Sequence, residues 1–99
     1  MAKPFYEVRQ LRDLRDLITQ SVELFGERPA FEVKDFKNKQ HYNISYNEYY
    51  ENINALGTAL IDMGLKNEKI AISGDNCYEW CLTYMATVLG VGVIVPIDK

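Results

Sequence analysis

The most reactive side chains in this 99-residue sequence belong to two cysteines and a single histidine. Cys77 and Cys81 are four positions apart, so a helix would place both thiols on one face. A zinc site needs further ligands, and His41 lies in a distant segment. A disulfide within one helical turn has unfavourable geometry. We therefore predict two free, half-buried thiols that pack as small apolar side chains.

Two residues could act as an acid or a base. His41 titrates near neutrality, but no constellation of serine, cysteine or aspartate lies close to it in the sequence. We interpret it as an exposed or cross-strand structural residue. Glu79 stands near the start of a predicted helix, which favours a capping role over that of a general acid.

Glycines that could hold phosphate groups are the next candidates. Gly74 ends an apolar strand, at the position where open α/β sheets bind ligands. No G-x-G-x-x-G or Walker pattern follows it. Gly90 and Gly92 come after a helix and before a strand, the reverse of the order in a dinucleotide site. The sequence thus provides no catalytic, cofactor-binding or metal-binding residue that we can assign.

Composition excludes some classes of function. Lys and Arg number 11 against 14 Asp and Glu, and the net charge of −3 argues against a nucleic-acid footprint. Four tyrosines gather near one predicted helix start, and without basic neighbours they indicate core packing rather than base stacking: Tyr42, Tyr46, Tyr49 and Tyr50. No apolar run is long enough to span a membrane, and the N-terminus lacks the apolar core of a signal peptide. We expect a cytoplasmic protein.

The predicted elements begin with an amphipathic helix that starts at Val8 or Leu11 and ends at Gly26. Its apolar face consists of Leu11, Leu14, Leu17, Ile18, Val22 and Phe25. This stripe could bind a partner, but packing on the rest of the domain is the usual role of such a face. Arg12 and Asp16 are spaced for a weak ion pair.

A β-hairpin and a second helix follow. The segments Ala30–Asp35 and Gln40–Ile44 alternate apolar and polar residues on either side of a polar turn, which predicts antiparallel strands. Ser45, with Glu48 three residues later, forms a capping box for the second helix. Gly64 is expected to end that helix in a Schellman motif.

The last third of the sequence predicts a strand–helix–strand unit. Lys69–Gly74 and Val91–Val95 are apolar without alternation, and Pro96 is expected to end the second strand. Such strands belong in a sheet that is covered on both faces, usually a parallel one. The helix between them, capped by Asn76 and running to about Gly90, is apolar on nearly all sides and should be buried on more than one.

Several motifs resemble adenylate-forming enzymes, a family of acyl-CoA synthetases, adenylation domains and luciferases. In chain order they are Ile44–Tyr49 with Leu56, Leu60 and Gly64, then Asn76–Trp80, then Gly90–Asp98. The Asn-x-x-Glu-Trp form of the middle motif is most similar to the long-chain fatty acyl-CoA synthetases. The resemblance covers roughly residues 29–99, with Gly57 and Val91 standing where the family often has alanine.

The resemblance implies that residues 1–99 are the N-terminal portion of the large domain of an acyl-CoA synthetase-like α/β fold. It implies a ligase that activates a carboxylic acid, with a fatty acid as the best guess, by reaction with ATP to give an acyl-adenylate. The acyl group would then be transferred to coenzyme A, and Mg²⁺ would assist at the phosphates. The family's catalytic motifs do not occur in these residues, so we expect this chain alone to bind no cofactor and to be inactive. The matched positions are interpreted as scaffold: Asn76, Glu79, Trp80, Gly92, Pro96 and Asp98.

Other functions remain open at this point. The chain could derive from an amino-acid adenylation domain or from a ligase for another carboxylate. It could also be a complete, non-catalytic α/β domain that binds a partner through its first helix or its sheet edge. Because the sequence stops on an apolar strand, we expect a piece of a longer domain, which could self-associate through the open sheet edge.

Overall fold

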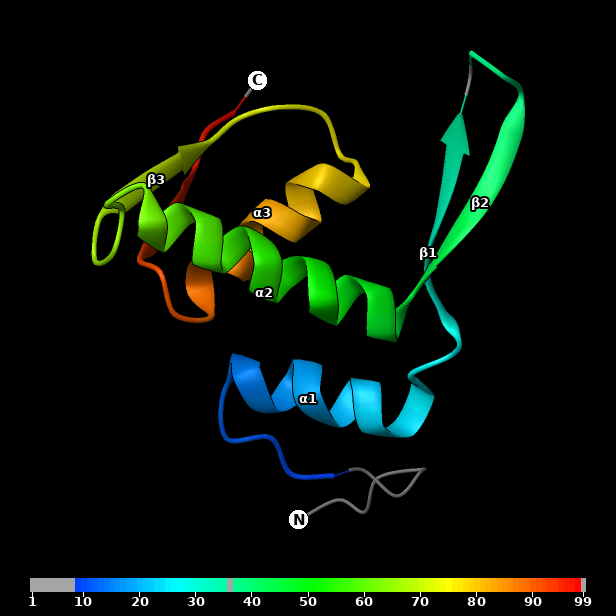
Figure 1. The fold of residues 1–99 in the computed structure, drawn as a ribbon, viewed down its shortest axis with the longest axis horizontal. Helices are drawn as coiled ribbons and strands as arrows, with labels where there is room; N and C mark the ends of the chain where they lie inside the picture. Colours follow the sequence, from blue (N-terminus) through cyan, green and yellow to red (C-terminus); the bar gives the residue numbers. More distant parts are fainter. Residues whose placement is uncertain (1–8, 36, 99) are drawn as a thin grey trace.

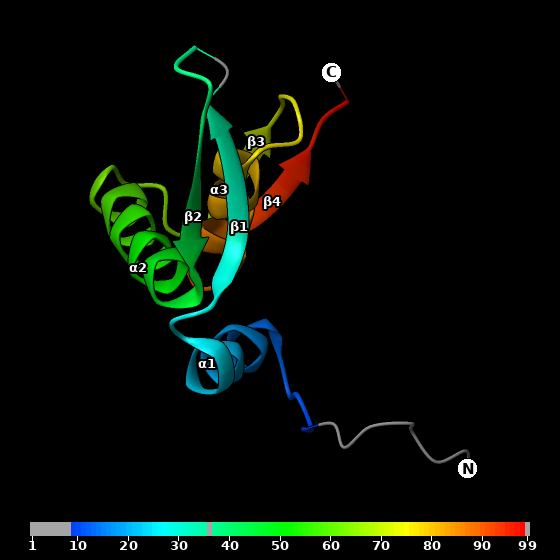
Figure 2. The same cartoon turned by 90° about the vertical axis from the view of Figure 1, so that its right-hand side faces the viewer.

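The computed structural model describes residues 9–35 and 37–98 and has an α/β architecture (Figures 1 and 2). The elements are α1 (Leu14–Phe25), β1 (Pro29–Asp35), β2 (Gln40–Ser45), α2 (Tyr46–Asp62), β3 (Lys69–Ile72), α3 (Tyr78–Val88) and β4 (Val93–Pro96). Helix α2 lies between α1 and α3, and the β1–β2 hairpin projects from its N-terminal end (Figure 1). The predicted order of helix, hairpin, helix and strand–helix–strand is confirmed.

Helix α1 begins later than predicted. Its N-cap is Asp13, whose carboxylate accepts a hydrogen bond of 2.8 Å from the Asp16 backbone N–H and so fixes the first turn at Leu14. Both predicted starts precede this cap, and one of them, Val8, lies outside the described residues. The predicted pair of Arg12 and Asp16 is confirmed at 2.7 Å, although Arg12 stands before the helix.

Gly26 is the C-cap of α1, as predicted, but its backbone is right-handed. A Cβ atom there would lie 2.6 Å from Oδ1 of Asn47. The Asn47 backbone N–H also donates to the Gly26 carbonyl at 2.9 Å. Glycine at this position therefore lets the end of α1 approach the start of α2.

The hairpin and α2 follow the sequence prediction closely. Strands β1 and β2 pair antiparallel from Phe31 opposite Ile44 to Asp35 opposite Gln40. The Ser45 hydroxyl caps α2 by accepting from the Glu48 backbone N–H at 3.1 Å.

The C-terminal end of α2 is a Schellman motif. The Leu65 N–H donates to the Leu60 carbonyl at 3.1 Å, and the Gly64 N–H donates to the Ile61 carbonyl at 2.9 Å. Gly64 has a positive φ of 86°, which glycine adopts without steric cost. The predicted motif is confirmed.

The strand–helix–strand unit is parallel, as predicted, with different bounds. Strands β3 and β4 pair from Lys69 opposite Val93 to Ile72 opposite Pro96, so Pro96 is the last strand residue rather than the stop after it. β4 starts later than expected because the N–H groups of Val91 and Gly92 still donate to the Thr87 carbonyl. That pair of bonds extends the end of α3 into the segment predicted as strand.

The N-terminus of α3 differs from the prediction. Cys77, not Asn76, is the N-cap, and its side chain makes no capping hydrogen bond. Extended backbone at Cys77 (φ −156°) delays the first helical turn by one residue. Glu79 consequently lies in the first turn and forms no capping box.

The core forms where α2 and α3 pack together. Ile53 and Ala86 are each 2% exposed, and Ile18 of α1 and Ile44 of β2 complete the buried cluster with Tyr49 and Leu89. Helix α3 contacts α2 on one side and β3 and β4 on another, so its predicted burial on more than one side is confirmed.

Coverage of the β3–β4 sheet is one-sided among the described residues, which corrects the expectation of two covered faces. Ile70, Ile72 and Ile94 are buried or half-buried. Val93 and Val95, on the opposite face, are 57% and 38% exposed. The reason is that α3 packs on one face only, and no described helix reaches the other.

Within the described residues, none of the helices has the length and apolar character needed to cross a lipid bilayer. A cytoplasmic location stays a prediction.

Two glycines offer a matched test of this packing. Replacing Gly92 by alanine is expected to lower the free energy of unfolding by about 1–3 kcal/mol, because the new Cβ would overlap the Glu68 backbone. Gly57→Ala should instead raise it by up to about 1 kcal/mol, since its Cβ would lie 3.6 Å from the Ala86 carbonyl oxygen and alanine favours the helix. Urea unfolding followed by circular dichroism measures both, and a shift of the same sign for the two variants would contradict the structure.

Candidate functional site

The candidate site is the turn between β3 and α3, residues 73–77, at the carboxyl end of the parallel sheet. Open α/β sheets bind ligands at this edge. All five residues of the turn are exposed. Gly74 has a φ of 158° with open space around its Cα, so conformation rather than crowding accounts for glycine there.

Two hollows flank the start of α3. A cavity of about 200 Å³ lies between the turn and the first turns of α3, and its wall includes Ile72, Trp80 and Thr83. A larger cleft of about 490 Å³ separates the start of α3 from the hairpin, where Lys34 and Tyr42 line it. Cys77 and Glu79 border both hollows.

The electrostatic character of the smaller cavity does not suit a polyphosphate. Its lining includes the carboxylates of Asp75 and Glu79, and none of the lining residues is Lys or Arg. Phosphate groups are bound in proteins by basic side chains together with backbone N–H groups. The lining of the smaller cavity therefore does not fit the triphosphate of ATP.

The structure keeps the sequence candidates apart. His41 lies on the exposed hairpin, with Nδ1 3.0 Å from a carboxylate oxygen of Glu32, so the cross-strand structural interpretation is confirmed. Cys77 and Cys81 are both free thiols, as predicted, although Cys77 is exposed and precedes the helix. Burial raises the pKa of the Cys81 thiol, with a further contribution from Cys77. Cys81 is thus held in the protonated, weakly nucleophilic form.

An aromatic cluster, missed as a unit by the sequence analysis, holds the hairpin against α2 and α3. The rings of Phe31, Tyr49 and Tyr78 meet edge to face, with centroid distances of 4.9, 5.1 and 5.9 Å. The Tyr49 hydroxyl donates to the Cys81 carbonyl at 3.2 Å. Burial, followed by the effects of Cys81 and Tyr78, raises the pKa of Tyr49 well above that of a free phenol. The alternating apolar positions of the hairpin were the available signal for Phe31.

The C-terminal end of α3 has cations that the sequence did not single out. An Arg15 N–H donates to the Leu89 carbonyl, and the Lys66 ammonium donates to the Gly90 carbonyl at 2.5 Å. The last turn of α3 contains no basic residue of its own. Positive charge from α1 and from the α2–β3 loop therefore compensates the exposed carbonyls.

The reactive side chains of the described residues lie in separate environments. Tyr49 and Cys81 have raised pKa values, which favour their neutral forms, and His41 contacts Glu32, a residue that lines the larger cleft. No group of three or more His, Cys, Asp or Glu residues that could hold a metal ion occurs in the described part of the chain.

Comparison with known proteins gives the family. A family model described as AMP-binding enzyme matches residues 18–99. This chain belongs to the AMP-binding enzyme family. The match takes in the hairpin, α2 and the whole strand–helix–strand unit, where the motifs of the predicted adenylate-forming resemblance lie.

Two curated proteins similar to this AMP-binding chain are the same ligase from two organisms. Long-chain-fatty-acid–CoA ligase ACSBG2 of Mus musculus is 31% identical over 83 residues, and that of Homo sapiens is 32% identical over the same length. The aligned region is 83% of this chain and 12% of each relative. The chain therefore spans only a small part of the length of these relatives.

Solved structures share the fold. IdnL1 superposes with a TM-score of 0.76 at 16% identity, covering 91% of this chain and 18% of its own. NpsA of Klebsiella oxytoca, in complex with 3-hydroxyanthranilyl-AMSN, superposes with a TM-score of 0.73 at 24% sequence identity. The match covers 90% of this chain and 17% of NpsA. CmiS6 superposes with a TM-score of 0.74 at 16% sequence identity, and the match covers 97% of this chain and 25% of CmiS6. These likenesses confirm the predicted fold class.

Three of the positions matched to family motifs have contacts within the strand–helix–strand unit. Trp80 stacks on Tyr84 with centroids 5.4 Å apart, Gly92 adjoins the Glu68 backbone, and Pro96 pairs with Ile72 at the end of β4.

The two thiols are expected to react at different rates with iodoacetamide. Exposed Cys77 should be alkylated first, and the rate at Cys81 should rise only at a higher pH than for a free cysteine, because burial raises its pKa. Peptide mass spectrometry of the native chain measures both rates, with Cys77→Ser as the control that isolates Cys81. In urea the two cysteines should be alkylated at equal rates. If Cys77 and Cys81 were also alkylated at equal rates in the folded chain, the predicted difference in their environments would be disproved.

Tyr49 should make the fold sensitive to alkali. Since its pKa is higher in the folded than in the unfolded chain, its contribution to stability is complete below the free phenol pKa of about 10 and is lost as pH rises above it. Tyr49→Phe should lower the free energy of unfolding by about 1 kcal/mol at neutral pH, because a hydrogen bond is lost. In the same variant the free energy of unfolding should decline less steeply as the pH rises. Urea midpoints between pH 7 and 11 measure this, with the exposed Tyr42→Phe as control. An unchanged alkaline slope in Tyr49→Phe would argue against this role.

Proposed function

We propose that residues 1–99 are the N-terminal portion of the large domain of a fatty acyl-CoA ligase. The observation that supports this best is the 31–32% identity over 83 residues to proteins named long-chain-fatty-acid–CoA ligase. The Asn76–Trp80 sequence, which resembles the long-chain branch of the family, is consistent with it. The whole protein would convert a fatty acid and ATP to an acyl-adenylate and pyrophosphate, and then transfer the acyl group to coenzyme A with release of AMP.

In this proposal the residues of the chain contribute positioning rather than chemistry. The smaller cavity beside the β3–α3 turn does not fit a triphosphate. ATP, Mg²⁺ and coenzyme A would be bound by other parts of the whole protein. The carboxylate substrate would likewise meet a pocket built elsewhere. The scaffold formed by α2, α3 and the sheet would hold those parts in register.

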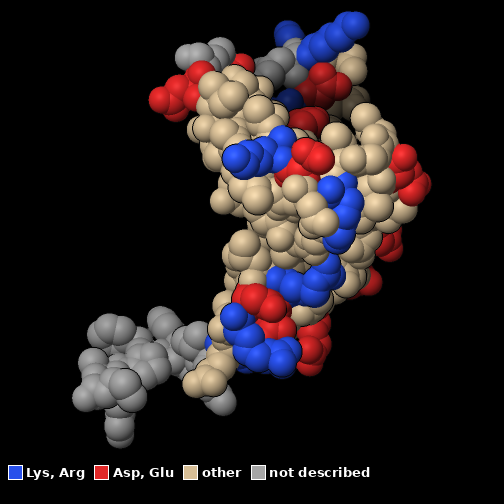
Figure 3. All heavy atoms as spheres, turned by 90° about the vertical axis from the view of Figure 1, so that its left-hand side faces the viewer, with Lys and Arg blue, Asp and Glu red and all other residues tan. Residues whose placement is uncertain are grey.

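The uncovered sheet face supports the view that this chain is one part of a larger unit. Val93, Val95 and Ile97 are exposed on or just beyond β4, at 57%, 38% and 51%. Figure 3 shows a hollowed and largely uncharged flank between the upper part of the molecule and the charged end of α1 below. We propose that the remainder of the AMP-binding domain packs on this sheet. In the isolated chain, the open edges of β3 and β4 would favour self-association.

The test is an exchange assay with two proteins. The full-length protein should incorporate labelled pyrophosphate into ATP in the presence of a long-chain fatty acid, whereas this chain alone should give only the background of a protein-free control. Exchange stimulated by amino acids or aromatic acids, but not by fatty acids, would replace the proposal with an adenylation function. Exchange by the 99-residue chain itself would refute the scaffold role.

A further inference from the structure

Helix α1 packs on the domain through a narrow contact. The prediction that its apolar stripe packs on the domain holds for Ile18, which is 7% exposed, and for Val22 beside it. The other large side chains of the predicted stripe are 39–49% exposed: Leu11, Leu14, Leu17, Leu24 and Phe25. Beside this contact lies a cleft of about 300 Å³, lined by residues of α1, α2 and the end of α3.

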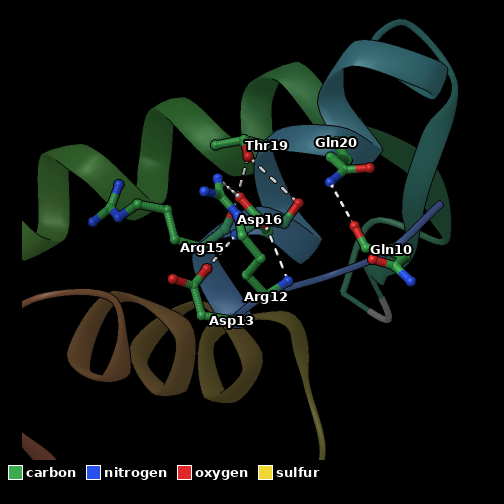
Figure 4. Close-up of polar contacts among 7 residues, drawn as sticks. All are labelled: Gln10, Arg12, Asp13, Arg15, Asp16, Thr19 and Gln20. Atoms are coloured by element: carbon green, nitrogen blue, oxygen red, sulfur yellow. Dashed lines mark hydrogen bonds and ion pairs between the residues drawn. The ribbon is translucent and has the colours of Figure 1, made fainter.

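Two cations from different segments of the chain meet in this cleft. Arg15 of α1 and Lys66 of the α2–β3 loop both line it. Their head groups donate to the consecutive carbonyls of Leu89 and Gly90 at the end of α3, and so lie close together. Figure 4 shows the Arg15 side chain extending from α1 toward the space between α2 and α3, away from Asp16.

The charge of these two cations exceeds what the neighbouring groups compensate. Neither forms an ion pair with a carboxylate of the described residues, and no Asp or Glu is among the described residues that line the cleft. Asp13 borders a neighbouring hollow with Arg15, and its carboxylate caps α1. The carbonyl end of α3 supplies only about half a negative charge, so roughly 1.5 positive charges remain.

The α2 wall of the cleft adds uncharged hydrogen-bond donors. Asn54 and Thr58 are four positions apart, on one face of α2, and both line the cleft. A guanidinium carries five N–H donors and an ammonium three, of which the contacts of Arg15 and Lys66 with α3 use one each. The cleft therefore offers several N–H and O–H donors to a ligand.

We propose that this cleft binds a phosphate group, as the free ion or as a phosphate monoester. A phosphate monoester carries about −1.5 to −2 charges at neutral pH, which matches the excess positive charge better than the single charge of a carboxylate does. Arg15 and Lys66 would donate charge-assisted hydrogen bonds to the phosphate oxygens, and Asn54 and Thr58 would donate neutral ones. The bound phosphate would connect α1 to α2 and to the end of α3.

The expected affinity is modest. Both cations are exposed, so water screens their charge. Two charge-assisted hydrogen bonds at such an open site predict a Kd on the order of 1 mM for inorganic phosphate. Because phosphate would bind only the folded chain, the temperature of unfolding should rise with phosphate concentration. The proposal concerns residues of this chain alone and does not depend on the ligase activity of the whole protein.

Isothermal titration calorimetry of the 99-residue chain with inorganic phosphate, at neutral pH and constant ionic strength, tests the proposal. Lys66→Gln should weaken binding at least about tenfold, because one charge-assisted hydrogen bond is lost. Lys37→Gln removes the same charge from the exposed hairpin turn and should leave the Kd unchanged. Far-ultraviolet circular dichroism verifies that each variant is folded. Absence of saturable binding up to about 10 mM phosphate, or equal weakening by the two variants, would overturn the proposal.

Two further ligands identify the chemistry and the source of the phosphate group. Acetate, with its single charge, should bind more weakly than phosphate, and an equal Kd for acetate would refute the assignment to phosphate. Glycerol 3-phosphate presents the same group as a monoester. Tighter binding of this monoester would assign the site to a phosphate ester, and equal Kd values would assign it to the free ion.

A variant that keeps both cations guards against a simple loss of structure. Thr58→Val removes one neutral donor from the α2 wall and should weaken phosphate binding about twofold to tenfold, with the unfolding temperature in the absence of phosphate little changed. If neither Thr58→Val nor Arg15→Gln changed the Kd, the phosphate would not lie in this cleft and the proposal would fail.

Discussion

The close packing of α2 on α3 is the constraint on which the rest of the structure depends. Ile53 and Ala86 are almost completely buried in this contact, and the Ala86 carbonyl lies beside Gly57 of α2. The two helices meet closely through small and branched side chains. The other elements pack on the remaining surfaces of these helices. The hairpin joins through the aromatic cluster at one end, and α1 joins through Ile18 at the side.

The parallel strands are held by the ends of α3. The bonds from Val91 and Gly92 to the Thr87 carbonyl turn the chain out of α3, and the bond from Val93 to the Glu68 carbonyl, at 2.9 Å, starts the pairing with β3. Thr87 is fully buried, and its hydroxyl donates to the Thr83 carbonyl at 2.8 Å, so its polar group is satisfied. The turn after α3 and the start of β4 therefore lie within the part of the chain that matches the AMP-binding family.

Patterns of neighbouring residues predicted the helices, strands and caps well. They could not predict contacts between segments that are far apart in the sequence. The caps at Ser45 and Gly64 depend on a few neighbouring residues, and both were found. The α3 cap was misplaced because Asn76 and Cys77 compete for one position, and only the backbone geometry decides between them. The Arg15 contact joins residues 74 positions apart, and the uncovered sheet face depends on where α3 lies, so neither has a local signal.

The Schellman end of α2 and the parallel pairing have a consequence for the order of folding. The contacts of α1 and the hairpin with α2 join segments that are neighbours in the sequence, and short loops close quickly. The pairing of Lys69 with Val93 must instead wait until α3 has been made and has crossed over. Because the core also needs Ala86 and Leu89, α1, the hairpin and α2 cannot complete their burial until α3 has been synthesised, and β3 and β4 can pair only after that.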